Sequence, residues 1–166
     1  EALIATLDLP QGGWSDAARK DALSRLQQAG LPERRDEYWK YTRPDTLTQP
    51  QAVSAAVRAS EDVALFDQID RLKLVFVDGV FDADASDDLA LEGITIERLA
   101  QANADLHWAR DLYGTLEKNG QTPVARPLAA LNTAFAADGV LIHVTDKVSK
   151  PVNIVYRRTS ETADVM

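Results

Sequence analysis

The chain of 166 residues contains no cysteine, which excludes disulfides, thiolate nucleophiles and cysteine-ligated metal within these residues. It also lacks long hydrophobic runs: runs such as residues 74–77 and 140–142 fall far below the roughly 18 residues that cross a membrane. A positive excess is missing too, because the formal net charge is −8. Such a charge repels a phosphate backbone, so we expect neither a membrane protein nor a nucleic-acid-binding protein.

Recognisable catalytic motifs are scarce as well. The sequence holds neither a G-x-x-x-x-G-K-[ST] phosphate loop nor a G-x-S-x-G nucleophile elbow. Its two histidines, His107 and His143, lie far apart, whereas zinc needs three or four nitrogen or sulfur ligands. The acidic residues 82–88 resemble the start of a calcium loop, but Asp87 replaces its turn glycine and Gly93 its bidentate glutamate. We therefore expect no enzyme active site, no metal site and no bound cofactor in this chain.

What the chain does contain is an ordinary globular composition. Hydrophobic residues make up 45% and charged residues 27%, which is close to the average for folded domains. The first residues carry neither the basic nor the apolar region of a secretory signal, so a cytoplasmic protein is expected. The chain begins at Glu1 without an initiator methionine and ends at Met166 without a stop signal, so we expect a piece of a longer protein.

Helical patterns, with apolar residues every three or four positions, alternate with strand patterns. Helices are predicted over residues 15–29, 31–43, 48–66, 97–117 and 127–137. Ser15 is the expected N-cap of the first, and Gly30 stands where a left-handed residue closes a helix. Strands are predicted over residues 72–77, 80–81, 94–96, 140–145 and 152–156, with a hairpin turn at Asp78 and Gly79. This order predicts an α+β fold with a β-rich continuation.

The stretch "LPERRDEYWKYTRPD", residues 31–45, concentrates aromatic and charged side chains. On a helix, Asp36 would pair with Lys40, and Arg35 could lie on the ring of Trp39, the expected anchor. Its acids and bases cancel, which disfavours nucleic acid. The residues alone leave open a packed polar surface helix or a protein interface.

Four segments resemble the SufB/SufD family of iron–sulfur cluster assembly proteins. "GLPERRDEYWKYT", residues 30–42, is similar to the family signature G-L-P-x-R-R-x-E-x-W-K-Y-T, with order and spacing intact. "LKLVFVDGVF", "PLAALNTAFAADGVLIHV" and "KPVNIVY" resemble later family segments in the same order. The departures are conservative: Lys73 stands where arginine is commoner, and Val80 where arginine often follows the glycine.

The resemblance implies a three-part architecture of a helical N-terminal domain, a right-handed parallel β-helix and a C-terminal helical domain. Residues 1–125 would then form the N-terminal domain with its small strand unit, and residues 126–166 a lead-in helix and the first β-helix strands. It also implies a non-catalytic scaffold that works with SufB-like and SufC-like subunits, the latter an ATPase. The iron–sulfur cluster would be assembled by the full complex, with sulfur supplied by a cysteine desulfurase system.

A docking or structural role is predicted for one group of residues in the signature. The group consists of Arg34, Arg35, Glu37, Trp39, Lys40 and Tyr41. Two other readings stay open at this point: a β-helix enzyme that cleaves polysaccharides with a carboxylate cluster, and an interaction module of unknown partner. Cutting a β-helix after its first strands would also expose an edge near residues 152–156, which predicts a homodimer through that edge.

Overall fold

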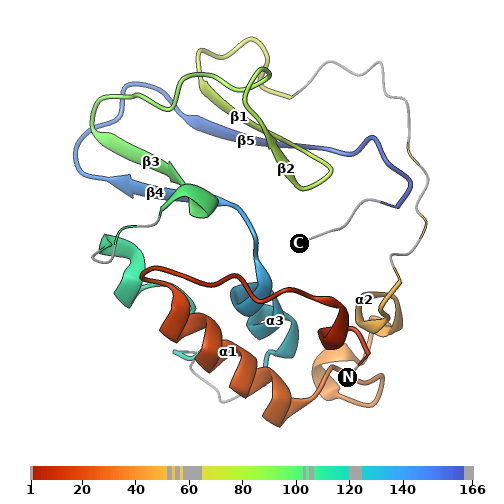
Figure 1. Cartoon of the computed structure of the whole chain (residues 1–166). Helices are drawn as coiled ribbons and strands as arrows, with labels where there is room; N and C mark the ends of the chain where they lie inside the picture. Colours follow the sequence, from red (N-terminus) through yellow and green to blue (C-terminus); the bar gives the residue numbers. More distant parts are fainter. Residues whose placement is uncertain are drawn as a thin grey trace. The chain divides into compact units, whose positions relative to one another are not determined.

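Two interleaved units make up the chain in the computed structural model shown in Figure 1. The structure describes residues 2–51, 54, 57, 65–102, 104, 107–119 and 125–162. One unit is built mainly from residues 1–53 and 102–137, and the other from residues 54–101 and 138–165. Each unit contains residues from both sides of the predicted domain boundary at residue 126. That boundary stays a prediction.

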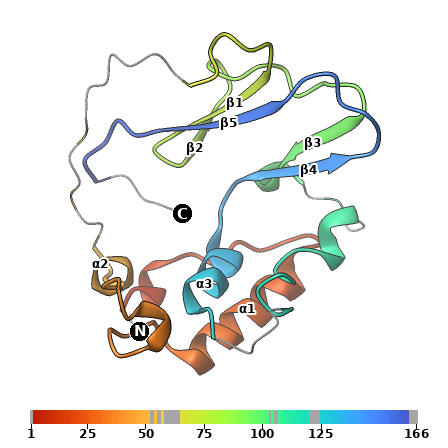
Figure 2. The ribbon, with the colours of Figure 1, turned by 180° about the vertical axis from the view of Figure 1, so that it is seen from behind.

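Two helices, α1 (Asp16–Ala29) and α3 (Pro127–Phe135), form the centre of the first unit. They lie side by side in both views (Figures 1 and 2). Their contact buries a cluster of small and branched apolar side chains: Ala22, Leu26, Ala130, Leu131, Ala134 and Phe135. Alanine lets the two backbones approach closely, and burial of a leucine such as Leu26 contributes about 1.5–3 kcal/mol. The predictions of both helices are confirmed.

The two ends of α1 behave differently from one another. Gly30 has φ 72°, and its N–H donates to the carbonyl of Leu26 at 2.9 Å, so the glycine closes the helix in the left-handed region as predicted. The predicted capping bond of Ser15 is wrong, because its side chain caps no helix N–H. Its Oγ instead accepts a bond from Nε of Arg19 at 3.1 Å.

The helix predicted over residues 31–43 is also wrong. Only a 3-10 turn, η2 (Glu37–Trp39), forms there, and α2 (Asp45–Thr48) follows it. The backbone bonds span three residues each, from Asp36 to Glu33 at 3.1 Å and from Trp39 to Asp36 at 2.9 Å. The segment lies between Pro32 and Pro44, and a helix this short is marginal unless an apolar face is packed.

The helix predicted over residues 97–117 is replaced by short elements. Strand β3 (Ile94–Arg98) runs past its predicted end into η3 (Leu99–Gln101), and η4 (Trp108–Asp111) leads into turns. Gly114 adopts φ 71°, which an α-helix does not accommodate. Most of the helix predicted over residues 48–66 lies outside the described residues.

The second unit holds two small sheets. Strands β1 (Leu72–Val77), β2 (Val80–Asp82) and β5 (Val152–Arg157) form one sheet in the order β2-β1-β5. β1 pairs antiparallel with β2 and parallel with β5, while β3 pairs antiparallel with β4 (Val140–Val144). Leu72, Leu74 and Ile96 form the buried centre. The described residues therefore form a mixed α+β fold, as predicted.

Strand β5 bears on two further predictions. One edge of β5 is paired in parallel with β1 over its whole length, so that edge is not open. Within the part of the chain that the structure describes, β5 is the outer strand of its sheet, and its other edge has no strand beside it. A single parallel pair does not establish a β-helix. The β-helix and the homodimer both stay predictions.

Candidate functional site

The predicted docking residues lie on a surface segment that carries η2. Arg34, Arg35, Lys40 and Tyr41 are exposed, and Trp39 is only partly buried. Tyr41 is 92% exposed and its neighbour Tyr38 is 68% exposed, which is unusual for large aromatic side chains. Glu37 belongs to η2, but its side chain lies outside the description. The structure thus places these residues where a partner could reach them, and their docking role stays a prediction.

The contacts inside this segment differ from those expected of a helix. Asp36 does not serve as the helical partner of Lys40; its Oδ2 accepts the backbone N–H of Glu33 at 2.9 Å. Nζ of Lys40 lies 5.5 Å from the ring centroid of Tyr41. Trp39 meets Tyr38 edge-on, with the ring centroids 6.5 Å apart. The segment is therefore organised by local turns rather than by side-chain pairs along a helix.

An open hollow of about 560 Å³ lies beside this segment. It is lined by residues from the end of α1, from the signature and from α2: Ala29, Gly30, Leu31, Pro32, Glu33, Arg34, Asp36, Asp45 and Thr48. Its charged lining carries both signs, since Arg34 stands among three carboxylates. Nothing in that lining resembles a catalytic arrangement, and the hollow extends the candidate docking surface toward α1.

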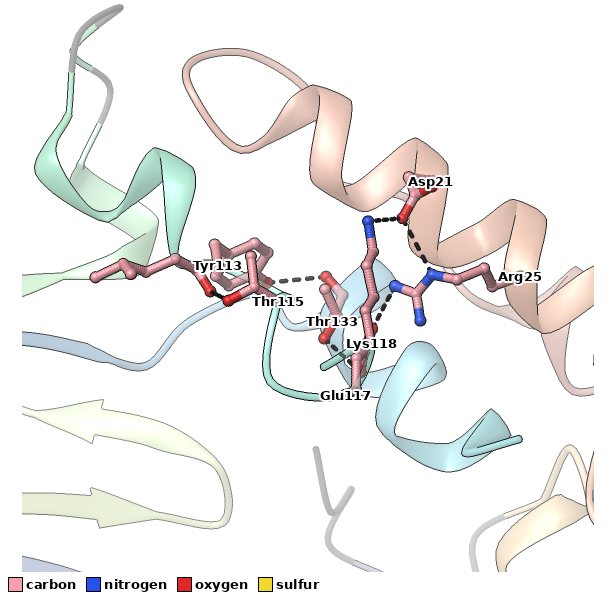
Figure 3. Close-up of polar contacts among 8 residues, drawn as sticks. Asp21, Arg25, Tyr113, Thr115, Glu117, Lys118 and Thr133 are labelled. Atoms are coloured by element: carbon pink, nitrogen blue, oxygen red, sulfur yellow. Dashed lines mark hydrogen bonds and ion pairs between the residues drawn. The ribbon is translucent and has the colours of Figure 1, made fainter. Parts of the chain in front are cut away.

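Figure 3 shows a polar network in the first unit that joins α1 to the turns after η4. Arg25 binds Asp21 at 3.0 Å on α1, and it also binds Glu117, whose side chain is only 7% exposed. Lys118 binds Asp21 from the same turn. Glu117 in turn accepts a bond from Oγ1 of Thr133 on α3 at 3.2 Å.

The charges of this network complement one another. The hydrogen bond from Lys118 holds the pKa of Asp21 below its ordinary value, and the bond from Arg25 acts in the same direction. Nearby, the hydroxyl of Tyr113 donates to the carbonyl of Thr133 at 2.8 Å, and burial raises the pKa of that tyrosine (Figure 3). The network fastens turns 112–118 to both helices, so its role is structural.

A buried arginine completes the interior of the first unit. Arg19 on α1 is 3% exposed, and one of its terminal nitrogens donates to the carbonyl of Ala134 at 3.0 Å. Its guanidinium carbon lies 5.5 Å from the ring centroid of Tyr113. The sequence analysis did not identify Arg19 or Glu117, because Ala134 and Arg25, their respective partners, lie far from them in the chain. The Asp21–Arg25 spacing of four residues was a visible signal for that pair alone.

The carboxylates of the acidic segment 82–88 accept hydrogen bonds from backbone N–H groups of the segment itself and of β1. Asp82 accepts the N–H of Ala85 at 3.0 Å, and Asp87 accepts the N–H of Lys73 at 2.6 Å. Each of these two carboxylates thus accepts a different backbone N–H. Within the described ranges, no three or more histidine or acidic side chains gather into a metal-binding group, and no helix is long and apolar enough to cross a membrane.

Comparison with known proteins gives two matches. The family described as SufBD protein N-terminal region matches residues 11–154, which covers most of both units. The iron–sulfur cluster assembly protein SufD of Escherichia coli (strain K12) is 31% identical over 152 residues, covering 82% of this chain and 33% of that protein. The chain thus spans about a third of the length of this relative.

Proposed function

Since the chain belongs to the SufBD family and matches its N-terminal region, we propose that it forms the N-terminal part of a SufD-like subunit in iron–sulfur cluster assembly. The subunit acts as a non-catalytic scaffold and works with a SufB-like subunit and a SufC-like ATPase. Its own contribution is to hold surfaces in place for assembly, and the cluster is the cargo of the complex.

One observation carries this proposal: the family match extends from residue 11 to residue 154. It therefore includes the signature of residues 30–42, the β1–β2 hairpin, helix α3, strand β4 and the first half of β5. A match confined to one short motif would support only a shared local structure. The relative named for iron–sulfur cluster assembly supports the same process over most of this chain.

The composition fits a scaffold role for this region. The 166 residues contain no cysteine, so they supply no thiolate for the usual ligation of a cluster. We propose that cluster chemistry belongs to other parts of the complex, and that residues 126–166 provide the lead-in helix and the first strands of a right-handed β-helix. Neither match favours a polysaccharide-cleaving enzyme.

The exposed signature supports a docking role within this proposal. Arginine and tyrosine are over-represented among the residues that dominate protein interfaces, and Arg34, Arg35 and Tyr41 stand exposed together. Reversing the charge of Arg34 and Arg35 to glutamate in the full-length protein should weaken binding of one assembly partner by about tenfold or more. If this variant bound its partners and supported cluster formation as well as the wild type does, Arg34 and Arg35 would have no docking role.

Co-purification tests the proposed function itself. A tagged full-length protein, isolated from cells that also produce the SufB-like and SufC-like subunits, should retain both at constant ratios. The matched control is the same preparation with the tag on an unrelated acidic protein of similar size. Isolation of the full-length protein without either subunit, at low salt and with all three proteins folded, would contradict the proposal.

A further inference from the structure

The turn between β1 and β2 has more contacts than a hairpin requires. Asp78 and Gly79 form it with φ values of 50° and 84°, and two successive positive values mark the tight turn that follows the twist of a hairpin. Aspartate tolerates this left-handed region, and asparagine before glycine forms the same turn at least as well. The turn by itself therefore does not explain a carboxylate at this position.

The carboxylate of Asp78 reaches across to the segment that follows β5. Its Oδ1 accepts the backbone N–H of Thr159 at 2.8 Å and that of Ser160 at 3.1 Å. Its Oδ2 accepts a bond from the hydroxyl of Thr159. The N–H of Asp78 also donates to the carbonyl of Arg157 at 2.9 Å. One residue thus binds Arg157, the last paired residue of β5, and the two residues Thr159 and Ser160 beyond it.

The chemistry of these bonds favours the ionised form of Asp78. The hydroxyl of Thr159 contributes most to lowering the pKa of this carboxyl, and the two backbone N–H groups add to the effect. The positive charge of Arg158 acts in the same direction. A charged acceptor makes shorter and stronger hydrogen bonds than a neutral one, so aspartate suits the position better than asparagine.

We propose that Asp78 is a latch that fixes Thr159 and Ser160 to the β1–β2 turn and so sets the direction in which the chain leaves β5. Val77 is the last residue of β1 paired with β5, opposite Arg157, and beyond this pair no further strand residue guides the chain. The hydrogen bonds of Asp78 hold the chain at Thr159 and Ser160, directly after this pair. This inference depends only on contacts within the second unit, so it stands or falls independently of the proposed function.

Hydrogen exchange at the amides of Thr159 and Ser160 in the full-length protein tests the latch. Asp78→Gly keeps the positive φ of the turn and removes every side-chain bond. We expect exchange of these two amides to become faster by on the order of tenfold, while the amides of β1 keep their protection. Asp84→Asn is the matched control, because Asp84 is an exposed aspartate on the loop after β2.

Two milder variants keep the test decisive if Asp78→Gly fails to fold. Asp78→Asn preserves the turn but loses the charge, and Thr159→Val removes one donor without a change of side-chain shape. Each should give faster exchange at Ser160 than the control does, with the smaller effect in Thr159→Val. Unchanged exchange at Thr159 and Ser160 in Asp78→Asn would overturn the latch, as would an equal increase in Asp84→Asn.

Discussion

Arg19 occupies a position on α1 where an apolar side chain would be expected. It lies one turn before Ala22 and two turns before Leu26 in the buried row of α1. Its guanidinium contacts Ser15, Ala134 and the ring of Tyr113. A buried charge is tolerated when its donors are used, and here the arginine satisfies two oxygen acceptors in the interior. A single residue thus ties the start of α1 to the end of α3.

Replacement of Arg19 by methionine should therefore destabilise the protein. The variant keeps much of the apolar stem but leaves the Oγ of Ser15 and the carbonyl of Ala134 without this donor, at a cost of about 2 kcal/mol. Urea unfolding measures the change. Lys20→Met on the exposed face of the same helix is the control, and it should change the free energy of unfolding by about 0.5 kcal/mol or less. Equal stability of the two variants would show that the Arg19 bonds contribute nothing.

At the scale of elements, the polar network of Asp21, Arg25, Glu117 and Lys118 predicts a pH dependence. The pKa of Asp21 is lower in the folded protein than in the unfolded chain, where it is about 3.8. The stabilisation that the ionised Asp21 gives to the folded state is therefore complete above about pH 3.8, and it is lost as the pH falls through the lower pKa of the folded state. The side chain is 46% exposed, so solvent screening limits the contribution to about 0.5 kcal/mol.

Asp21→Asn should remove this part of the acid dependence. Free energies of unfolding measured from about pH 6 to about pH 3 would fall less steeply in the variant than in the wild type. Lys118→Met should have a similar effect, since Lys118 is the larger cause of the shift. If the free energy of unfolding fell equally steeply with decreasing pH in the wild type, Asp21→Asn and Lys118→Met, the pairing of Asp21 with Lys118 would not be the source of this acid dependence.

The connection around Gly93 leads to a prediction about backbone space. Gly93 has φ 81°, and a Cβ added there would lie 2.7 Å from the carbonyl oxygen of Lys147. Its own carbonyl accepts the N–H of Thr145 at 2.9 Å, so a shift of this backbone would disturb the end of the β3–β4 pair. Gly93→Ala should cost about 1–3 kcal/mol, measured by thermal or urea unfolding.

Gly139→Ala is the matched control for Gly93→Ala. Gly139 lies before β4, and a Cβ added there would meet nothing within 4 Å. Its substitution should change the free energy of unfolding by less than about 1 kcal/mol. If Gly139→Ala lowered the free energy of unfolding as much as Gly93→Ala does, the close contact with Lys147 would not explain the destabilisation by Gly93→Ala.

The elements also show which parts of the fold the sequence predicts. The β1–β2 hairpin and α3 were predictable because their signals are local: alternation around Asp78 and Gly79, and an apolar stripe that begins at a proline. The helix over residues 31–43 was wrong because its pattern of charges and aromatics has no buried face to stabilise it. The bond between Arg19 and Ala134 joins positions 115 residues apart, and no local pattern carries such information.

At the scale of the whole molecule, the chain accounts for a third of the length of its curated relative. The signature residues Arg34, Arg35 and Tyr41 identify the family more firmly than they explain its activity, because the structure shows them exposed and organised by turns. Their docking role stays a prediction. The proposed scaffold role therefore needs a test in the complete assembly.

The most direct measurement is cluster formation by the complete complex with and without the full-length protein. The SufB-like and SufC-like subunits, a sulfur donor, iron and an apoprotein acceptor would be combined with the full-length protein in one reaction and without it in a second. The account predicts that cluster transfer is several-fold slower in the reaction that lacks the full-length protein. Equal transfer in both reactions would contradict the account.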